Sequence, residues 1–186
     1  METSDMLAKT GMGSPILLPG MVLREPEAEY AARLRIYVDT SVFGGCEDEK
    51  FQEESLQLFE AFYCGTATLV YSEVTERELK NAPLSVRAII KRIPEAHFET
   101  LPETEQAHSL AKAYIEAGAV GPKHFNDALH VAIASIGEVD VIASWNFKHL
   151  VRPGRVQAYN VVNERRGHPK IDIQFPEDIS YDEQGR

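Results

Sequence analysis

The 186-residue sequence has very little cysteine, and this scarcity excludes several classes of protein. Cys46 and Cys64 are too few to form the disulfide framework that stabilises many small secreted domains. Neither lies in a CxxC motif or a Cys/His cluster, so the spacing typical of a structural zinc site is missing. We expect two reduced thiols in a cytoplasmic protein.

Long hydrophobic runs are also missing, although 44% of the residues are hydrophobic. We find no stretch of about 18 uncharged apolar residues that could form a membrane-spanning helix. The first residues do not combine a basic segment with an apolar core, which is the pattern of a secretion signal. We therefore expect neither a membrane partner nor export, and the length suits one domain with a substantial core.

Positive charge is in the minority, with 19 lysine and arginine residues against 29 aspartate and glutamate residues and a formal net charge of −10. Taken alone, this charge argues against a nucleic-acid partner, since phosphate contacts favour basic surfaces. The basic residues are nevertheless concentrated: residues 148–170 contain six of them with one acid, and residues 79–94 contain four with none. These segments leave room for an RNA substrate, although a basic cluster can equally be a solvated face.

The pattern of the sequence changes near residue 34. Residues 1–33 hold all four methionines and show no sustained hydrophobic period, so we predict a flexible N-terminal extension. Residues 34–176 are expected to form one domain, and residues 177–186 an acidic C-terminal tail.

Within the predicted domain, segments with strand character alternate with segments of helical period. This alternation predicts an α/β fold in which helices cover both faces of a parallel sheet. In such sheets, polar groups gather at the carboxyl ends of the strands. Strands are expected over residues 35–39, 66–71, 97–101, 139–144 and 171–175, and helices over 49–63, from Ser72 to Pro83, over 84–93, 104–117 and 124–136, and from Asn160 onward.

Two aspartates occupy places that a purely structural role does not readily explain. Asp39 ends a strand-like run, where a carboxylate either binds a ligand or caps the following turn. Asp127 lies in the first turns of an alanine-rich helix, and its neighbours at Val131 and Ala134 are apolar. A favourable interaction with the helix dipole explains an acid near the N-terminus, but not one on the packed face. We predict that both side chains approach the strand ends.

Glu78 and Asn146 are further candidates. Glu78 belongs to the helix that Ser72 caps, in which Glu73 and Glu76 fit better as first-turn dipole acids. The alternative for Glu78 is a glutamate that faces solvent. Asn146 follows the fourth predicted strand, and its amide oxygen either binds a metal or orients a water; a turn-forming asparagine is the alternative.

Carboxylates with neutral oxygens suit hard ions such as Mg²⁺ or Mn²⁺. Such an ion keeps waters and completes its shell with phosphate oxygens, as in metal-assisted phosphodiester hydrolysis. His124 and His130 flank Asp127 at three residues on either side, so a His/Asp metal or acid–base site competes with this interpretation, as does simple packing. Trp145 and Phe147 either stack on an unpaired RNA base or pack in the core.

Four segments together resemble the PIN-domain family, and especially the VapC-type toxin ribonucleases. They read IYVDTS at residues 36–41, SEVTERE at 72–78, NDALHVA at 126–132 and DVIASWNF at 140–147, and the resemblance extends over about residues 35–175. It implies a three-layer α/β fold with a parallel sheet of about five strands. It also implies an endoribonuclease that depends on Mg²⁺ or Mn²⁺, is commonly a homodimer, and is held inactive by a cognate antitoxin protein.

The resemblance implies roles for individual residues. The family's first three acidic positions fall on Asp39, Glu78 and Asp127, which would be catalytic residues and metal ligands. The fourth falls on Asn146, a neutral residue, which implies a weakened second metal site and a one-ion mechanism as an alternative. Ser41, by its position, would bind metal-linked water or the scissile phosphate.

Two other classes of function compete with a toxin or RNA-processing endoribonuclease. One is a catalytically weak PIN-like module that binds RNA or protein and has a degraded metal site, as Asn146 and the acidic net charge suggest. The other is a phosphotransfer enzyme with Asp39 as nucleophile, for which the sequence offers neither a second strand-end aspartate two residues on nor a suitably placed lysine.

Overall fold

Five short strands form one parallel sheet in the computed structural model, which describes residues 33–180. The strand order is β3-β2-β1-β4-β5, and every neighbouring pair is parallel. The prediction of a parallel sheet of about five strands is therefore confirmed. The strands are β1 (Leu34–Val38), β2 (Ala67–Ser72), β3 (Phe98–Leu101), β4 (Val141–Ala143) and β5 (Asp172–Gln174).

Alternating side chains of the strands face two separate hydrophobic cores. Ile36 and Val38 of β1 pack into one core, while Tyr37 between them packs into the other. Such alternation follows from the two-residue period of a strand. Both faces of the sheet are therefore buried, as the near-continuous apolar strands require.

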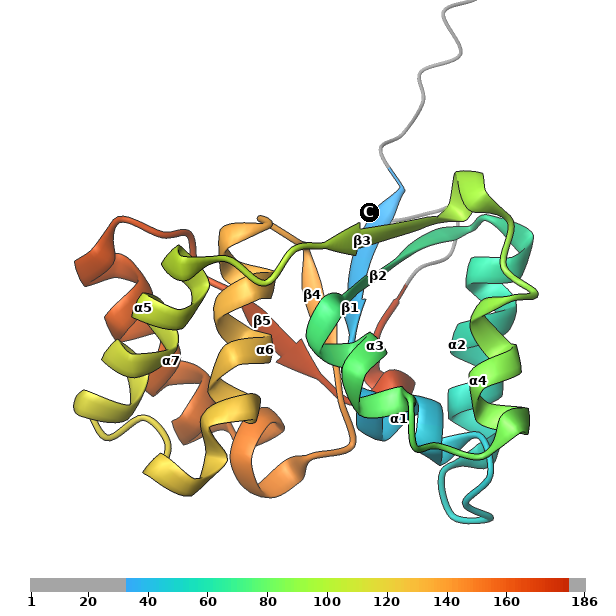
Figure 1. Ribbon diagram of the computed structural model, residues 1–186, viewed down its shortest axis with the longest axis horizontal. Coiled ribbons are helices and arrows are strands. Elements are labelled where there is room, and N and C mark those ends of the chain that lie inside the picture. Colours follow the sequence, from blue (N-terminus) through green and yellow to red (C-terminus); the bar gives the residue numbers. More distant parts are fainter. Residues whose placement is uncertain (1–32, 181–186) are drawn as a thin grey trace, which may run out of the picture. The chain divides into compact units, whose positions relative to one another are not determined.

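Helices cover each face and complete three layers (Figure 1). One core contains residues of α5, α6 and α7, and the other contains residues of α1, α2 and α4. Helix α3 contributes Val74 to the first core and Leu79 to the second. The predicted three-layer arrangement is thus confirmed. The helices are α1 (Thr40–Gly45), α2 (Gln52–Cys64), α3 (Glu73–Leu79), α4 (Leu84–Ile90), α5 (Glu105–Glu116), α6 (Phe125–Ile136) and α7 (Pro153–Arg166).

Two helix starts agree with the capping residues seen in the sequence. The Ser72 hydroxyl accepts a hydrogen bond from the backbone N–H of Thr75 at 3.4 Å, which fixes the start of α3 directly after β2. The Thr104 hydroxyl accepts from the N–H of Ala107 at 3.2 Å at the start of α5. The Ser72 cap determines where the polar residues of α3 emerge from the sheet edge.

The predictions for three segments were incomplete or wrong. The short helix α1, which follows Asp39, was not predicted, because its sequence TSVFGG combines β-branched residues with two glycines. The π-helix Phe147–Val151 was also not predicted. Helix α7 begins at Pro153 and not at Asn160; proline suits the first helical position because it needs no N–H partner there.

The chain remains packed after β5. A short 3₁₀ helix covers Pro176–Asp178, and the buried Ile179 joins the core that contains α2. The expected N-terminal extension, apart from Arg33, and residues 181–186 of the expected acidic tail lie outside the described residues. Over the part of the chain that the structure covers, no helix has the length and apolarity needed to span a membrane.

Candidate functional site

Asp39 lies at the carboxyl end of β1, and its carboxylate is held by two serines. The Oδ2 atom accepts hydrogen bonds of 2.6 Å from Ser41 and of 2.6 Å from Ser144, which follows β4. The side chain is buried and makes no capping bond to α1, so turn capping does not explain this aspartate. Its orientation is instead set by hydroxyl groups from two strand ends.

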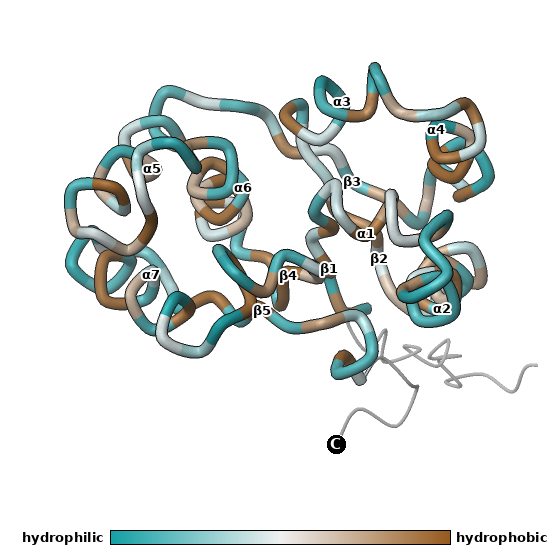
Figure 2. The backbone as a smooth tube through the Cα atoms, turned by 90° about the horizontal axis from the view of Figure 1, so that it is seen from below, coloured by the Kyte–Doolittle hydropathy of each residue, from teal (hydrophilic) through white to brown (hydrophobic). Residues whose placement is uncertain are grey.

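The parallel register explains why these residues meet. Val38 pairs with Ala143, so the next residues along each strand, Asp39 and Ser144, leave the sheet at the same edge. The backbone N–H of Asp39 also donates to the carbonyl of Ala143 at 3.1 Å. This edge faces the viewer in Figure 2, which is seen from below the view of Figure 1.

Glu78 of α3 turns inward, unlike the first-turn acids of the same helix. Its Oε2 accepts from the Thr40 hydroxyl and lies 3.2 Å from His130 Nε2, while Oε1 accepts from the Asn126 amide at 3.0 Å. Burial by itself raises the pKa of Glu78, but the hydrogen bonds from His130 and Thr40 outweigh it and lower the pKa to about 2. Glu78 is therefore an ionised carboxylate beside the start of α1.

Asp127 lies in the first turn of α6 and uses both carboxylate oxygens. Oδ1 accepts from the Asn146 amide nitrogen at 3.0 Å, and Oδ2 lies 3.2 Å from His124 Nδ1. Burial raises the pKa of Asp127, and the negative charge of Asp39 raises it further; Glu78 acts in the same direction. The three predicted carboxylates thus interact electrostatically at one edge of the sheet.

A continuous set of hydrogen bonds joins Asp39 to Asp127. Ser144 donates to Asp39 and accepts the backbone N–H of Asn146 at 2.9 Å, and the Asn146 side chain donates to Asp127. Asn146 also accepts from the N–H of His149 at 3.1 Å, so its carbonyl oxygen is engaged. Asn146 is consequently a spacer between the two aspartates in this structure.

The carboxylates of Asp39, Glu78 and Asp127 are chemically suited to a hard divalent ion, but they are spaced widely for direct binding of one ion by all three. The three carboxylates are oxygen donors, and a cation would relieve the repulsion that raises the pKa of Asp127. Over residues 33–180, the one set of three His, Cys, Asp or Glu ligand atoms within 4.8 Å of one another is His124, Asp127 and His149. Mg²⁺ commonly binds one or two carboxylates directly and keeps several waters, so wider spacing suits water-bridged contacts.

Several residues that complete this site differ from what the sequence predicts. His130, a candidate metal or acid–base group in the sequence, is buried and bonded at both ring nitrogens, to Tyr37 at 2.7 Å and to Glu78. Ser144 and Thr40 were missed, although the register of β1 and β4 indicates the first and the position next to Asp39 the second. His149 was missed because the π-helix that carries it has no recognisable sequence period.

The two aromatic candidates differ in exposure. Trp145 stacks on Phe51 with ring centroids 4.5 Å apart and donates to Ser55 at 2.9 Å, so it packs in the domain. A side chain at Gly45 would clash with both Trp145 and Ser55, which explains the glycine there. Phe147 is 56% exposed and remains accessible beside the site.

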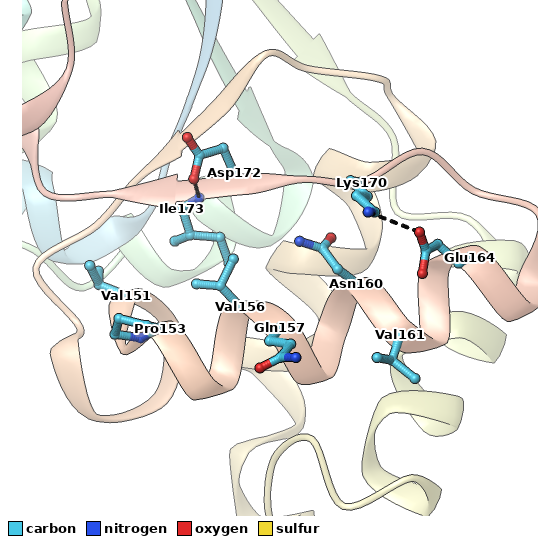
Figure 3. A pocket seen from close by; sticks show the side chains of 10 residues that line it. All are labelled: Val151, Pro153, Val156, Gln157, Asn160, Val161, Glu164, Lys170, Asp172 and Ile173. Carbon is cyan, nitrogen blue, oxygen red and sulfur yellow. Dashed lines mark hydrogen bonds and ion pairs between the residues drawn. The ribbon is translucent and has the colours of Figure 1, made fainter.

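A separate surface pocket of about 500 Å³ lies between α7 and β5 (Figure 3). Its lining is mainly apolar and amide side chains, with an ion pair of 3.1 Å between Lys170 and Glu164 and the carboxylate of Asp172. None of the predicted site residues lines it. This pocket therefore offers no constellation that suggests chemistry.

Neither a protein-family model nor a curated protein sequence matches the chain. Among solved structures, the fold is similar to a chain in the crystal structure of VapBC2 from Rickettsia felis bound to a DNA fragment from their promoter. The two share 11% sequence identity with a TM-score of 0.48, over 76% of this chain and 98% of that chain. A similarity of this size assigns no residue role, ligand or partner to this chain.

Proposed function

We propose that this chain is a metal-dependent endoribonuclease that hydrolyses RNA phosphodiester bonds and acts as the toxin of a toxin–antitoxin pair. The observation that carries the proposal is that Asp39, Glu78 and Asp127 come from separate parts of the chain and lie near enough to one another for the charges of Asp39 and Glu78 to raise the pKa of Asp127. Glu78 and Asp127 each lie beside a histidine, whereas the hydrogen-bond partners of Asp39 are serine hydroxyls. Neighbouring carboxylates that repel one another are costly, and a bound cation is the usual compensation.

The residues that would hold Mg²⁺ or Mn²⁺ are Asp39, Glu78 and Asp127. The ion, when bound, would lower the pKa of an attacking water and stabilise negative charge on the phosphate. Ser41 and Ser144 keep the Asp39 carboxylate in one orientation, which reduces the reorganisation needed during the reaction.

The remaining side chains would position the ligands and the substrate. His130 and Thr40 keep Glu78 ionised, so it remains an anionic ligand over the physiological pH range. Asn146 orients Asp127 through its amide nitrogen. Ser41, whose hydroxyl also accepts the backbone N–H of Trp145 at 2.9 Å, would contact metal-linked water or the scissile phosphate.

The proposed partners follow from the resemblance in the sequence motifs and from the charge distribution. An RNA substrate is compatible with the six basic residues between positions 148 and 170, which follow the site residue Asn146 along the chain. A cognate antitoxin and a homodimer belong to the same proposal. Growth arrest on expression of the chain alone, relieved by the Asp39→Asn substitution, would support the toxin role.

The decisive experiment measures RNA cleavage with Mg²⁺ and with Mn²⁺. Asp39→Asn and Asp127→Asn should each reduce the rate by about 100-fold or more, the scale expected when one electrostatic stabiliser of a transition state is lost. Asp140→Asn is the matched control, because Asp140 is exposed and bonds to the N–H of Arg35 at the opposite sheet edge. Undiminished cleavage by folded Asp39→Asn and Asp127→Asn proteins would rule out the proposed site.

A second candidate function is a PIN-like module that binds RNA or protein without cleaving it. The observation that favours it is that protein groups already bond each of the three carboxylates, with Asn146 donating to Asp127. Titration with Mn²⁺ separates the two functions. The binding module predicts no saturable Mn²⁺ binding at millimolar concentration and no metal-dependent cleavage.

A further inference from the structure

We propose that His124, Asp127 and His149 form a binding site for a divalent transition-metal ion such as Zn²⁺, distinct from the acidic site for Mg²⁺ or Mn²⁺. The three residues come from separate places in the chain: the end of the 3₁₀ turn Pro122–His124, the first turn of α6, and the π-helix Phe147–Val151. One ligand atom from each lies within 4.8 Å of the other two.

The two imidazole rings are already arranged side by side. Their centroids are 3.6 Å apart and their planes differ by 25°, so the rings are stacked. His124 Nδ1 lies 3.2 Å from Asp127 Oδ2. Two ring nitrogens and one carboxylate oxygen therefore lie close together, and the stacked rings need to turn so that the in-plane lone pairs of both face one ion. All three residues are partly exposed, so an ion can enter from solvent.

An unpaired ring nitrogen of His149 is an independent observation that points to a ligand. Its Nδ1 atom is buried and is the one buried side-chain polar atom without a hydrogen-bond partner over residues 33–180. Leaving a buried ring nitrogen unpaired costs free energy, and such atoms are uncommon in native proteins. The imidazole is therefore not fully committed to interactions with the protein.

The backbone of His149 is held by hydrogen bonds, although one nitrogen of its ring has no partner. Its N–H donates to Asn146 Oδ1 at 3.1 Å, and its carbonyl accepts from the Tyr159 hydroxyl at 3.2 Å. These bonds hold a π-helix, a conformation that often occurs at functional sites. The fold thus places the ring of His149 against that of His124 by constraints that are independent of the rings themselves.

The donor set determines the class of ion. Imidazole nitrogens suit zinc, iron, nickel and copper, whereas Mg²⁺ prefers oxygen ligands alone. Two histidines with one carboxylate leave at least one coordination position for water or substrate. Asp127 Oδ1 is bonded by Asn146, which is the outer contact expected to orient a ligating carboxylate.

The proposed zinc site overlaps the acidic site at Asp127, but its two histidine ligands are separate from it. The oxygen Oδ2 faces His124, whereas Oδ1 faces the hydrogen-bond path to Asp39. Asp39 and Glu78 are not ligands of the proposed transition-metal site. Loss of Asp39 should therefore abolish cleavage without removing a ligand of the zinc site.

The test is calorimetric titration of the untagged full chain with Zn²⁺ in buffer that contains millimolar Mg²⁺. We expect one Zn²⁺ per chain, with affinity reduced at least 10-fold in His124→Ala and in His149→Ala. His168→Ala is the matched control, because His168 is partly exposed and does not belong to the three-residue group. Asp39→Asn should keep zinc binding within about threefold of the unsubstituted chain while losing any Mg²⁺-dependent cleavage, so the two proposals fail separately.

A second measurement locates the ion even where an alanine variant folds poorly. In ¹⁵N spectra of the histidine rings, Zn²⁺ should shift the signals of His124 and His149 and leave those of His97 and His168 in place. His124→Gln, which preserves side-chain size and polarity, should bind zinc as weakly as His124→Ala. Zinc binding that persists at full affinity in both histidine variants, or no binding up to millimolar Zn²⁺, would overturn the proposal.

Discussion

Two groups of polar side chains around α6 differ in how completely the protein satisfies their histidines. In the first, which we call the inner network, Tyr37, Ser72, Glu78 and His130 are bonded to one another, and His130 has a partner on each ring nitrogen. In the second, which we call the outer cluster, His124, Asp127 and His149 converge, and His149 Nδ1 has no partner.

This difference separates a structural histidine from one available to a ligand. A buried polar group is retained at low cost only when its hydrogen bonds are complete, so His130 is suited to fixing β1, β2, α3 and α6 against one another. The outer cluster is partly exposed and incompletely bonded. We expect the inner network to determine stability and the outer cluster to determine ligand binding.

The largest expected effect comes from His130→Ala. The change leaves the Tyr37 hydroxyl and the Glu78 carboxylate without their shared partner and opens a cavity in a fully packed region. We expect the free energy of unfolding to fall by about 3 kcal/mol, measured by urea denaturation. His168→Ala should change it by no more than about 0.5 kcal/mol. Equal effects of the two substitutions would remove the distinction between inner and outer histidines.

Tyr37→Phe should have the next largest effect. The substitution deletes a hydroxyl that lies 2.7 Å from Ser72 Oγ and 2.7 Å from His130 Nδ1. It leaves His130 Nδ1 unpaired and removes one of the partners of Ser72, without creating a large cavity. We expect a loss of about 1–2 kcal/mol in the free energy of unfolding. Tyr63→Phe is the control, since Tyr63 is 54% exposed.

The connection between these residues can be tested further in a double variant. Because Tyr37 and His130 share one bond, the loss in a Tyr37→Phe, His130→Ala protein should be smaller than the sum of the two single losses. Strict additivity would indicate that the hydrogen bond contributes nothing beyond packing.

The parallel sheet, its covering layers of helices and the position of Asp39 at a strand end could be predicted from the sequence, because they depend on local patterns. The apolar strand ending at Asp39 and the capping residue Ser72 placed both segments correctly, and the alternation of strands and helices indicated the parallel sheet. The inward position of Glu78 could not be derived from helical spacing alone. It depends on Thr40 and Asn126, which only the tertiary structure brings to it.

The outer cluster could not be predicted for a related reason. His124 and Asp127 are three residues apart and visibly paired in sequence, but His149 joins them through a π-helix that follows no regular hydrophobic period. The same irregularity concealed the start of α7 at Pro153. Sequence patterns identify regular elements, while this site depends on an irregular one.

Glu78→Gln tests the inner network through the pH dependence of stability. The pKa of Glu78 is lowered from 4.5 to about 2 in the folded state, so its stabilising contribution is complete above about pH 4.5 and is lost as the pH falls towards 2. The carboxylate is partly exposed, so solvent screening reduces this contribution. We expect the free energy of unfolding to fall by about 1 kcal/mol less between pH 5 and pH 3 in Glu78→Gln than in the unsubstituted chain.

The control for this titration is Glu76→Gln, which removes an exposed carboxylate from the same helix. Denaturation of each protein across the pH range, followed by circular dichroism, measures the effect. If Glu78→Gln and Glu76→Gln show the same slope between pH 5 and pH 3, then Glu78 is not held by His130 and Thr40 as described.

The smallest effect is expected for the outer cluster in metal-free buffer. His149→Ala removes the stacking contact with His124, but it also removes a buried nitrogen without a partner, and the two changes oppose each other. His124→Ala removes a partly exposed contact to Asp127, of a kind that contributes little. Each should therefore alter the free energy of unfolding by less than about 0.5 kcal/mol in the presence of a chelator. A loss comparable to that of His130→Ala would mean that the outer histidines support the fold as much as the inner one does. Their stacking, rather than metal binding, would then be the reason for their arrangement.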